Sequence, residues 1–299
     1  METVEVKLKW LIVGSKGQLG QTFCRALNAT GVEFFELNRG HGNICDQNFV
    51  DSYISSIRPD VIVNAVAWTD VDGAESNETS ANLINADVAS FLAIQAKKID
   101  SVFIHISTDY VFSGSGNIPW SESDEKCPTS VYGRSKAKGE EYVLTLYPEK
   151  SYIFRTSWLY SKFGSNFAKS MITLALKNEN ELKVVGDQIG QPTSAEDLVS
   201  QIVKSVELRI PFGIYHATNT GQASWFEFAQ EIFQKCGSDI NRIIQVTSQE
   251  YNRLATRPAF SVLGQDAWAR TNLNPMRDWK LALQEHLPDI LDTVRMKGE

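Results

Sequence analysis

Residues 9–20 decide the fold and run Lys9-Trp10-Leu11-Ile12-Val13-Gly14-Ser15-Lys16-Gly17-Gln18-Leu19-Gly20. The first half is a short apolar run, typical of a strand that is buried on both faces. The second half spaces glycines as G-x-x-G-x-x-G, and apolar residues then recur every four positions at Leu19, Phe23 and Leu27. The stretch therefore predicts a strand, a glycine turn, and a helix that opens inside the glycine run and stops at Gly31.

This strand–turn–helix unit predicts a dinucleotide site. Glycines permit a tight turn and a close approach of the backbone, while the amides and the dipole at the helix start receive a diphosphate. The spacing differs from the common G-x-G-x-x-G form, so glycines that only make a turn are the structural alternative. The cofactor-binding residues predicted here are Gly14, Lys16, Gly17, Gln18, Leu19 and Gly20.

A second predicted strand, residues 32–37, is followed by Arg39. An acid at about this distance from the glycines selects NAD, whereas an arginine suits the additional phosphate of NADP. Together with Lys16, Arg39 favours NADPH over NADH, which stays possible, although either cation could be an ordinary solvated side chain. Chain order places further cofactor-binding residues near the adenine and at the end of the third strand: Asn43, Ile44, Ala65 and Ala67.

Strands and helices continue to alternate along the chain, which predicts an α/β fold with a Rossmann-type, doubly wound parallel sheet. We expect an NAD(P)-binding domain over residues 1–160, rejoined by 194–220, and a smaller C-terminal α/β substrate-binding lobe mainly over 161–299. The predicted elements are strands at 59–67, 102–106, 151–158, 213–217 and 242–246, and helices at 79–97, after Pro128, and at 194–207, 224–236 and 278–286.

The fourth predicted strand, 102–106, delivers Thr108 and Asp109 into a loop at the carboxyl edge of the sheet, where such folds place their chemistry. Further on, Tyr132 and Lys136 are four residues apart and would share one face of a helix. A cation held close to a phenol lowers its pKa and makes it a better general acid. The spacing is common by chance, so this catalytic prediction depends on the position of the pair opposite the glycine loop.

Composition excludes several classes of protein. The 299-residue chain has a formal net charge of -7, which disfavours nucleic acid and anionic membranes as partners. It contains no apolar run of the roughly 18 residues that a membrane helix needs, and its start does not resemble an export signal. Its 4 scattered cysteines predict free thiols in a reducing cytoplasm and no metal site.

The ordered set of motifs resembles the extended short-chain dehydrogenases and, within them, the dTDP-4-dehydrorhamnose reductase family. The resemblance covers nearly the whole chain. It rests on Gly14-x-x-Gly17-Gln18-Leu19-Gly20, on the segments 64–75, 107–114 and 155–158, on Tyr132-Gly133-x-x-Lys136, on Gly190-Gln191-Pro192-Thr193 and on Arg257-Pro258-x-x-Ser261-x-Leu263.

The resemblance implies a function for each matched residue. Tyr132 would give a proton to the keto oxygen, Lys136 would hold the nicotinamide ribose and depress the Tyr132 pKa, and Thr108 would hydrogen-bond the same oxygen. Hydride would pass to C4 of dTDP-4-dehydro-6-deoxy-L-mannose and give dTDP-L-rhamnose for polysaccharide synthesis. The substrate-binding residues implied are Thr108, Asp109, Trp158 and Asn166, and the planar fork of Arg257 suits the substrate diphosphate.

Several alternatives stay open. Trp158 could be a core tryptophan and Arg257 a surface arginine. Trp68 and Gly73 depart from the family pattern, which leaves the exact sugar open. Tyr110 after Asp109 argues against a dehydratase. An epimerase of the same fold, and a non-catalytic regulatory subunit like the beta subunit of methionine adenosyltransferase, remain as alternatives, and a homodimer is compatible with the sequence.

Overall fold

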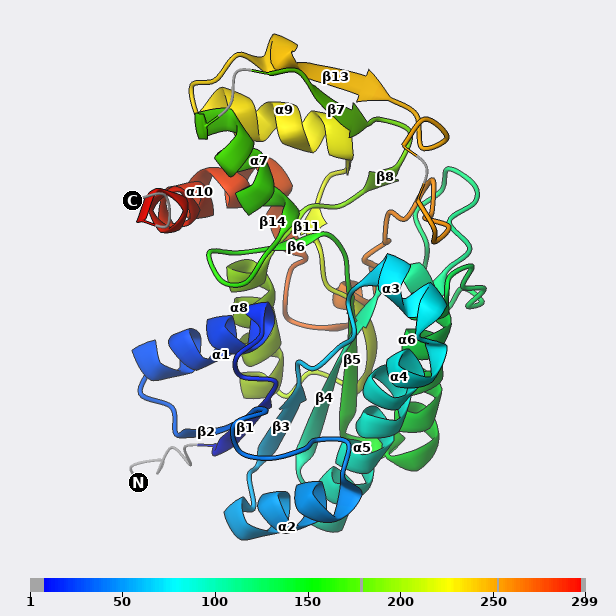
Figure 1. Cartoon of the computed structure of the whole chain (residues 1–299). Coiled ribbons are helices and arrows are strands. Elements are labelled where there is room, and N and C mark those ends of the chain that lie inside the picture. The colour runs from blue at the N-terminus through cyan, green and yellow to red at the C-terminus, as the bar shows by residue number, and fades with distance from the viewer. Residues whose placement is uncertain (1–7, 178–179, 252, 297–299) are drawn as a thin grey trace.

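The computed structural model describes residues 8–177, 180–251 and 253–296 (Figure 1). Its centre is a six-stranded sheet with the order β10-β5-β4-β3-β1-β2, in which all neighbouring strands are parallel. From β1 the chain adds β2 on one side and then β3 on the other, so the strand order reverses there, as in a doubly wound sheet. The predicted Rossmann-type α/β fold is confirmed. The strands are β1 (Trp10–Val13), β2 (Phe34–Leu37), β3 (Val61–Asn64), β4 (Val102–Thr108), β5 (Ser151–Thr156) and β10 (Gly213–His216).

The predicted strand–turn–helix unit is β1 followed by α1 (Gln18–Ala29). Every residue of β1 is buried, and Gly17 stands at the N-cap of α1. Gly14 has φ +88, a backbone conformation that L side chains rarely adopt. A Cβ on Gly20 would overlap the carbonyl oxygen of Gly14, so this glycine permits the close packing of the helix on the turn.

Helices cover both faces of the sheet, as Figure 1 shows. On one face α1 and α8 (Ala195–Glu207) pack against strand residues that include Ile12 and Val63. On the other face, Leu11 and Ile62 pack against three helices. Adjacent strand residues point to opposite faces, so a sheet covered on both sides needs the continuous apolar runs seen in the sequence. The three helices are α2 (Gln47–Ile57), α5 (Val88–Lys98) and α6 (Val131–Leu146).

The C-terminal lobe has a separate core, in which Phe228, Ile172 and Leu283 are fully buried. A parallel pair of strands, β7 (Leu182–Val185) and β13 (Ile243–Val246), forms its edge. The lobe helices are α7 (Phe167–Lys177), α9 (Trp225–Lys235) and α10 (Trp279–Met296). Ser194 caps α8, and β10 pairs with β5 in the main sheet, both as predicted. The division into two domains stays a prediction.

Shorter elements complete the described chain. Among them are α3 (Val71–Ser76) and α4 (Glu78–Asn82), a π-helical turn at Leu83–Asp87, and 3-10 turns at Asp109–Val111, Pro148–Lys150, Ile240–Arg242 and Asp266–Arg270. The short strands are β6 (Leu159–Tyr160), β8 (Ile189–Gly190), β9 (Thr193–Ser194), β11 (Asn219–Thr220), β12 (Ala223–Ser224) and β14 (Met276–Asp278).

Several predicted boundaries are wrong, among them the end of the strand expected at 151–158, which lies at Thr156. Strand β4 extends through Thr108 instead of ending at 106, because Ser107 and Thr108 continue the pairing with β5. The helix expected at 278–286 continues to Met296 through Pro288, because its buried residues on both sides of the proline pack into one core. Strand β3 ends at Asn64 rather than at 67. Helices α2 and α7 were not predicted.

The helix expected at 79–97 is present but is interrupted by the π-helical turn. Asn85 lies in this turn, where its Oδ1 accepts the Trp68 backbone N–H at 2.8 Å and its Nδ2 donates to Ser135 Oγ at 2.9 Å. Single π turns occur mostly inside α-helices and often at functional sites. The turn thus ties the loop after β3 to α6. Within the described residues, no helix combines the length and apolarity needed to cross a membrane.

Candidate active site

The glycine-loop cavity, of about 910 Å³, opens at the carboxyl ends of β1, β2 and β3. Most of the predicted cofactor-binding residues line it together: Gly14, Lys16, Gly17, Arg39, Asn43, Ile44, Ala65 and Ala67. The rest of the lining consists of Asn38, Gly40, Gly42, Cys45, Val66 and Ile84. Ile84 comes from the π-helical turn, which the sequence did not reveal.

The remaining three predicted residues lie in the first turn of α1, outside the lining of the glycine-loop cavity. Leu19 and Gly20 are buried, Leu19 in the sheet core and Gly20 against the turn. The side-chain oxygen of Gln18 accepts a hydrogen bond from Asn166 Nδ2 at 3.3 Å. These residues hold the helix start in place rather than form the cavity wall.

The charges of the glycine-loop cavity suit an anion. Lys16 and Arg39 are in its wall, and the lining residues in the described chain include no acid. The start of α1 adds its backbone amides and the positive end of the helix dipole. The residues present therefore fit a dinucleotide with several phosphates, and Arg39 stands where a 2′-phosphate would need a cation.

The Tyr132 and Lys136 pair lies on the first turns of α6, which Ser130 caps through the Gly133 backbone N–H. The Lys136 ammonium is buried and donates to the Ile106 carbonyl oxygen of β4 at 2.5 Å. Its Nζ is also 3.5 Å from His105 Nε2. Burial lowers the Lys136 pKa to about 8, although the negative charge of Glu140 acts to raise it.

The pKa of Tyr132 is raised overall in this structure, and its predicted lowering by Lys136 stays a prediction. Burial, with a smaller contribution from the charge of Asp109, outweighs a hydrogen bond with Thr108 and raises the pKa of Tyr132 to about 12. The Lys136 ammonium is directed to the Ile106 carbonyl of β4. Tyr132 is therefore fully protonated at neutral pH and ready to donate.

Thr108 and Asp109 stand where β4 ends. Thr108 Oγ1 donates to Asp109 Oδ1 at 2.9 Å and accepts the Tyr110 backbone N–H at 3.2 Å. Asp109 is 2% exposed, and burial raises its pKa to about 6 although hydroxyl and amide donors favour its ionised form. A carboxyl with such a pKa changes charge near neutral pH, which is frequent at functional sites.

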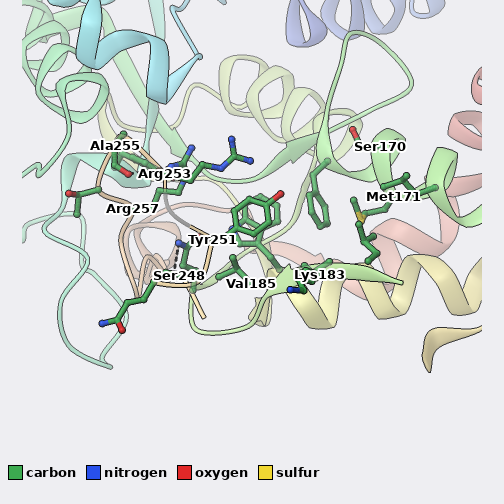
Figure 2. Close-up of a pocket in the computed structure, with 18 residues that line it drawn as sticks. Ser170, Met171, Lys183, Val185, Ser248, Tyr251, Arg253, Ala255 and Arg257 are labelled. Atoms are coloured by element: carbon green, nitrogen blue, oxygen red, sulfur yellow. Dashed lines mark hydrogen bonds between the residues drawn. The ribbon is translucent and has the colours of Figure 1, made fainter. Parts of the chain in front are cut away.

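A second cavity, of about 650 Å³, lies between the turn that follows β4 and the C-terminal lobe, and we call it the lobe cavity. Figure 2 shows Arg253, Ala255 and Arg257 at one end and Ser170 and Met171 at the other. Its wall is Tyr110, Phe167, Ser170, Met171, Leu174, Leu182, Lys183, Val184, Val185, Gln188, Trp225, Ser248, Gln249, Tyr251, Arg253, Ala255, Thr256 and Arg257.

Tyr110 connects the lobe cavity to the Tyr132 pair. Its ring lines the cavity and packs edge-on against the ring of Tyr132, with centroids 5.5 Å apart and an interplanar angle of 74°. From the sequence, Tyr110 was interpreted only as evidence against a dehydratase, and its place beside Tyr132 was not predicted. The contact places the ring of Tyr132 next to Tyr110, a residue of the cavity wall.

Arg257 lines the lobe cavity, but its planar fork is already paired. Its Nη2 and Nη1 donate to the two carboxylate oxygens of Asp72 at 2.8 and 3.1 Å, and this pairing lowers the Asp72 pKa to about 2. Arg253 is 3.6 Å from the same carboxylate and is more exposed. Two arginines thus share Asp72, and the charge of Asp70 also acts on Arg257, but the described wall of the cavity contains both arginines and no acid.

Trp158 and Asn166 lie behind the cavity walls. The Trp158 indole stacks on Trp225, with centroids 3.5 Å apart and an interplanar angle of 8°, and Trp225 is the ring that lines the lobe cavity. Asn166 Oδ1 accepts the Lys169 backbone N–H at 3.0 Å, and its Nδ2 donates to the Ser161 carbonyl at 2.8 Å. Their predicted contact with substrate stays a prediction.

The family model described as RmlD substrate binding domain matches residues 8–291. The chain belongs to the RmlD family. The matched range includes the glycine-loop cavity, the Tyr132 pair and the lobe cavity, so the RmlD family model covers the whole candidate site. The family resemblance inferred from the motifs is confirmed.

Individual RmlD relatives match over nearly their full length. SpsK, a spore coat polysaccharide biosynthesis protein of Bacillus subtilis (strain 168), is 41% identical over 94% of this chain and 97% of its own. The dTDP-4-dehydrorhamnose reductase of Streptomyces griseus is 40% identical over 94% and 93%. The structure of dTDP-4-dehydrorhamnose reductase from Bacillus anthracis str. Ames in complex with NADP has a TM-score of 0.91 and 35% identity, covering 95% of this chain and 99% of that one.

Proposed function

We propose that this protein is an NADPH-dependent reductase of the C4 keto group of dTDP-4-dehydro-6-deoxy-L-mannose, forming dTDP-L-rhamnose. The observation that carries the proposal is the position of Tyr132, which shares a helix face with Lys136, adjoins Thr108 and contacts Tyr110 of the lobe cavity. Two relatives support the choice of chemistry, the reductase of Streptomyces griseus and the NADP complex from Bacillus anthracis.

In the proposed reaction the cofactor and substrate enter separate cavities. When bound, NADPH would be held by the glycine-loop cavity and would supply hydride chemistry at the carbonyl carbon. Tyr132 donates its hydroxyl proton to the carbonyl oxygen, so one hydride and one proton complete the alcohol and Tyr132 is left as a phenolate. Lys136, which is cationic below its pKa of about 8, stabilises that anion and holds the cofactor ribose. Solvent later returns the proton to Tyr132.

The lobe cavity would hold the nucleotide part of the substrate. Its cationic end, with Arg253 and Arg257, suits the diphosphate, and its aromatic and aliphatic remainder suits the base. In this proposal residues 1–160 and 194–220 bind the cofactor, and the lobe within 161–299 binds the sugar nucleotide. The four free thiols suit a cytoplasmic location.

The test follows NADPH and NADH oxidation with a panel of nucleotide-linked 4-keto-6-deoxy sugars. The parent protein should oxidise NADPH with the dTDP-linked L-sugar, and Tyr132→Phe should lower kcat by about 10²- to 10⁴-fold because the proton donor is removed. Tyr142→Phe, on the same helix, is the matched control and should stay within twofold, roughly the effect of a surface change. A parent that reduces no ketosugar, or a fully active Tyr132→Phe, contradicts the proposal. An inactive parent that copurifies with a synthetase would support the regulatory-subunit alternative.

A further inference from the structure

Thr108 has a single hydroxyl hydrogen, for which Asp109 and Tyr132 are both hydrogen-bonding neighbours, and in this structure Asp109 receives it. The Thr108 hydroxyl donates to Asp109 Oδ1 at 2.9 Å, while the Tyr110 backbone N–H donates to Thr108 Oγ1 at 3.2 Å. The proposed reduction needs that same hydrogen on the substrate carbonyl oxygen. An ionised carboxylate can only accept hydrogen bonds, so the two demands conflict as long as Asp109 carries a charge.

The surroundings of Asp109 disfavour that charge. The carboxyl is 2% exposed, and its Oδ2 has no hydrogen bond of good geometry to any residue that the structure describes. The groups that favour its ionised form are neutral donors, which are the hydroxyls of Ser261 and Thr108 and the backbone amides of Asp109 and Tyr110. Burial outweighs them and raises the pKa of Asp109 to about 6.

Two phenols face Asp109, Tyr110 from its own segment and Tyr132 from α6, and its charge raises the pKa of both. Arg257, the cation on this side, acts on Tyr110 and is itself paired with Asp72. Proton donation by Tyr132 leaves a phenolate beside Asp109. A second negative charge there would oppose the reaction, because like charges at close range destabilise each other.

We propose that Asp109 is a positioning residue whose carboxyl is neutral during the reduction, donates its O–H to Thr108 Oγ1, and so turns the Thr108 hydroxyl toward the substrate carbonyl oxygen. Thr108 then accepts from Asp109 and from Tyr110, and its one hydrogen is available to the substrate. The carboxyl proton stays on Asp109 throughout. This inference rests on the proposed reductase function and assigns Asp109 an action through Thr108 rather than on the sugar.

The test compares pH profiles of kcat/KM between pH 5 and 8 for the parent, Asp109→Asn and the control Asp292→Asn, an exposed aspartate on α10. The parent and the control should lose activity by about tenfold per pH unit above the carboxyl pKa, as a single ionisation requires. Asp109→Asn, whose amide N–H₂ is a permanent donor, should lose less than about threefold from pH 6 to 7.5.

Two further measurements distinguish a positioning role of Asp109 from a purely structural role. In a Thr108→Val background, Asp109→Asn should no longer change the pH profile, because the hydroxyl through which it acts is absent. The urea midpoint of Asp109→Asn should exceed that of the parent by more at pH 8 than at pH 5, because burial of the carboxylate destabilises the parent fully above its folded pKa of about 6 and this effect declines as the pH falls toward the ordinary Asp value of 3.8.

An active parent whose pH profile is parallel to that of Asp109→Asn overturns this inference and leaves the proposed function standing. The inference is also overturned by a folded Asp109→Asn protein that is inactive at every pH, and by a profile change that persists with Thr108→Val. A parent that reduces no ketosugar overturns the proposed function, and this inference with it.

Discussion

Lys136→Met should make the protein more stable and nearly inactive. The Lys136 ammonium is buried, and burial lowers its pKa from 10.5 to about 8, so at pH 7 the folded protein carries a charge in a place that disfavours it. Each pH unit by which a pKa moves corresponds to about 1.4 kcal/mol, so the burial of this charge costs about 3 kcal/mol. Methionine fills a similar volume without a charge.

The substitution also removes a favourable contact. The hydrogen bond from Lys136 to the Ile106 carbonyl is lost, at a cost of about 1 kcal/mol. The free energy of unfolding of Lys136→Met should therefore exceed that of the parent by about 2 kcal/mol at pH 7. Activity should fall by about 10²-fold or more, because the phenolate of Tyr132 loses its nearby cation.

The stability difference between Lys136→Met and the parent should depend on pH. Between about pH 8 and 10.5 the folded parent binds fewer protons at Lys136 than the unfolded chain does, so its stability rises with pH through that window. Lys136→Met lacks this rise, and the difference between the two proteins should shrink or reverse by pH 9.5. Tyrosines with raised pKa values act equally in both proteins and cancel in the difference.

Urea unfolding at pH 7 and pH 9.5, followed by circular dichroism, measures both free energies, and the m-value should not change. Lys98→Met is the control, because Lys98 is exposed and makes a surface pair with Asp51 at 3.3 Å worth about 0 to 1 kcal/mol. A Lys136→Met protein that is less stable than the parent at pH 7, or a difference that does not change with pH, refutes this reasoning.

Two further substitutions test separate parts of the site. Arg39→Ala should raise the KM for NADPH by about 10- to 100-fold and leave the KM for NADH within about twofold, because a charge-assisted hydrogen bond to the 2′-phosphate is lost; equal effects on both cofactors would contradict the assignment. Glu140→Gln should lower the free energy of unfolding by about 3 to 5 kcal/mol, since it leaves the buried Arg155 unpaired after the loss of bonds at 2.8 and 2.9 Å. Glu141→Gln, exposed on the same helix, should change it by less than about 1 kcal/mol.

Signals within a short stretch of sequence predicted the fold well. The unit of β1, the glycine turn and α1 depends on neighbouring residues, and so does the start of α8 at Ser194, whose hydroxyl accepts the Asp197 backbone N–H. A buried strand and a helix cap each need only a few residues in a fixed order. The cavity lining near the glycines followed from the same short stretch.

Structural features that depend on packing between distant segments could not be predicted from the sequence. Pro288 usually ends a helix, but α10 passes through it because Leu283, Leu287 and Ile290 all pack into the lobe core. The lobe cavity gathers its wall mainly from α7, β7 and residues 248–251 and 253–257, and among these lining residues Arg257 alone had a motif signal for a ligand. Arg257 was predicted from its chemistry, whereas its partner Asp72 is 185 residues away and became visible only in the structure.

The buried charged groups around β4 and α6 divide by how well they are paired. Glu140 receives two hydrogen bonds from Arg155 and one from Ser107, so its pKa is lowered and its charge is fixed. Asp109 and Lys136 have no comparable ion pair among the described residues, and burial moves their pKa values in opposite directions, to about 6 and about 8. Groups whose pKa values are moved toward neutrality are those that can change charge during turnover. Of these buried residues, Asp109 and Lys136 have pKa values just below and just above neutral pH, and both are associated with Tyr132. For this reason we assign the chemistry to the position of Tyr132 and a structural role to Glu140.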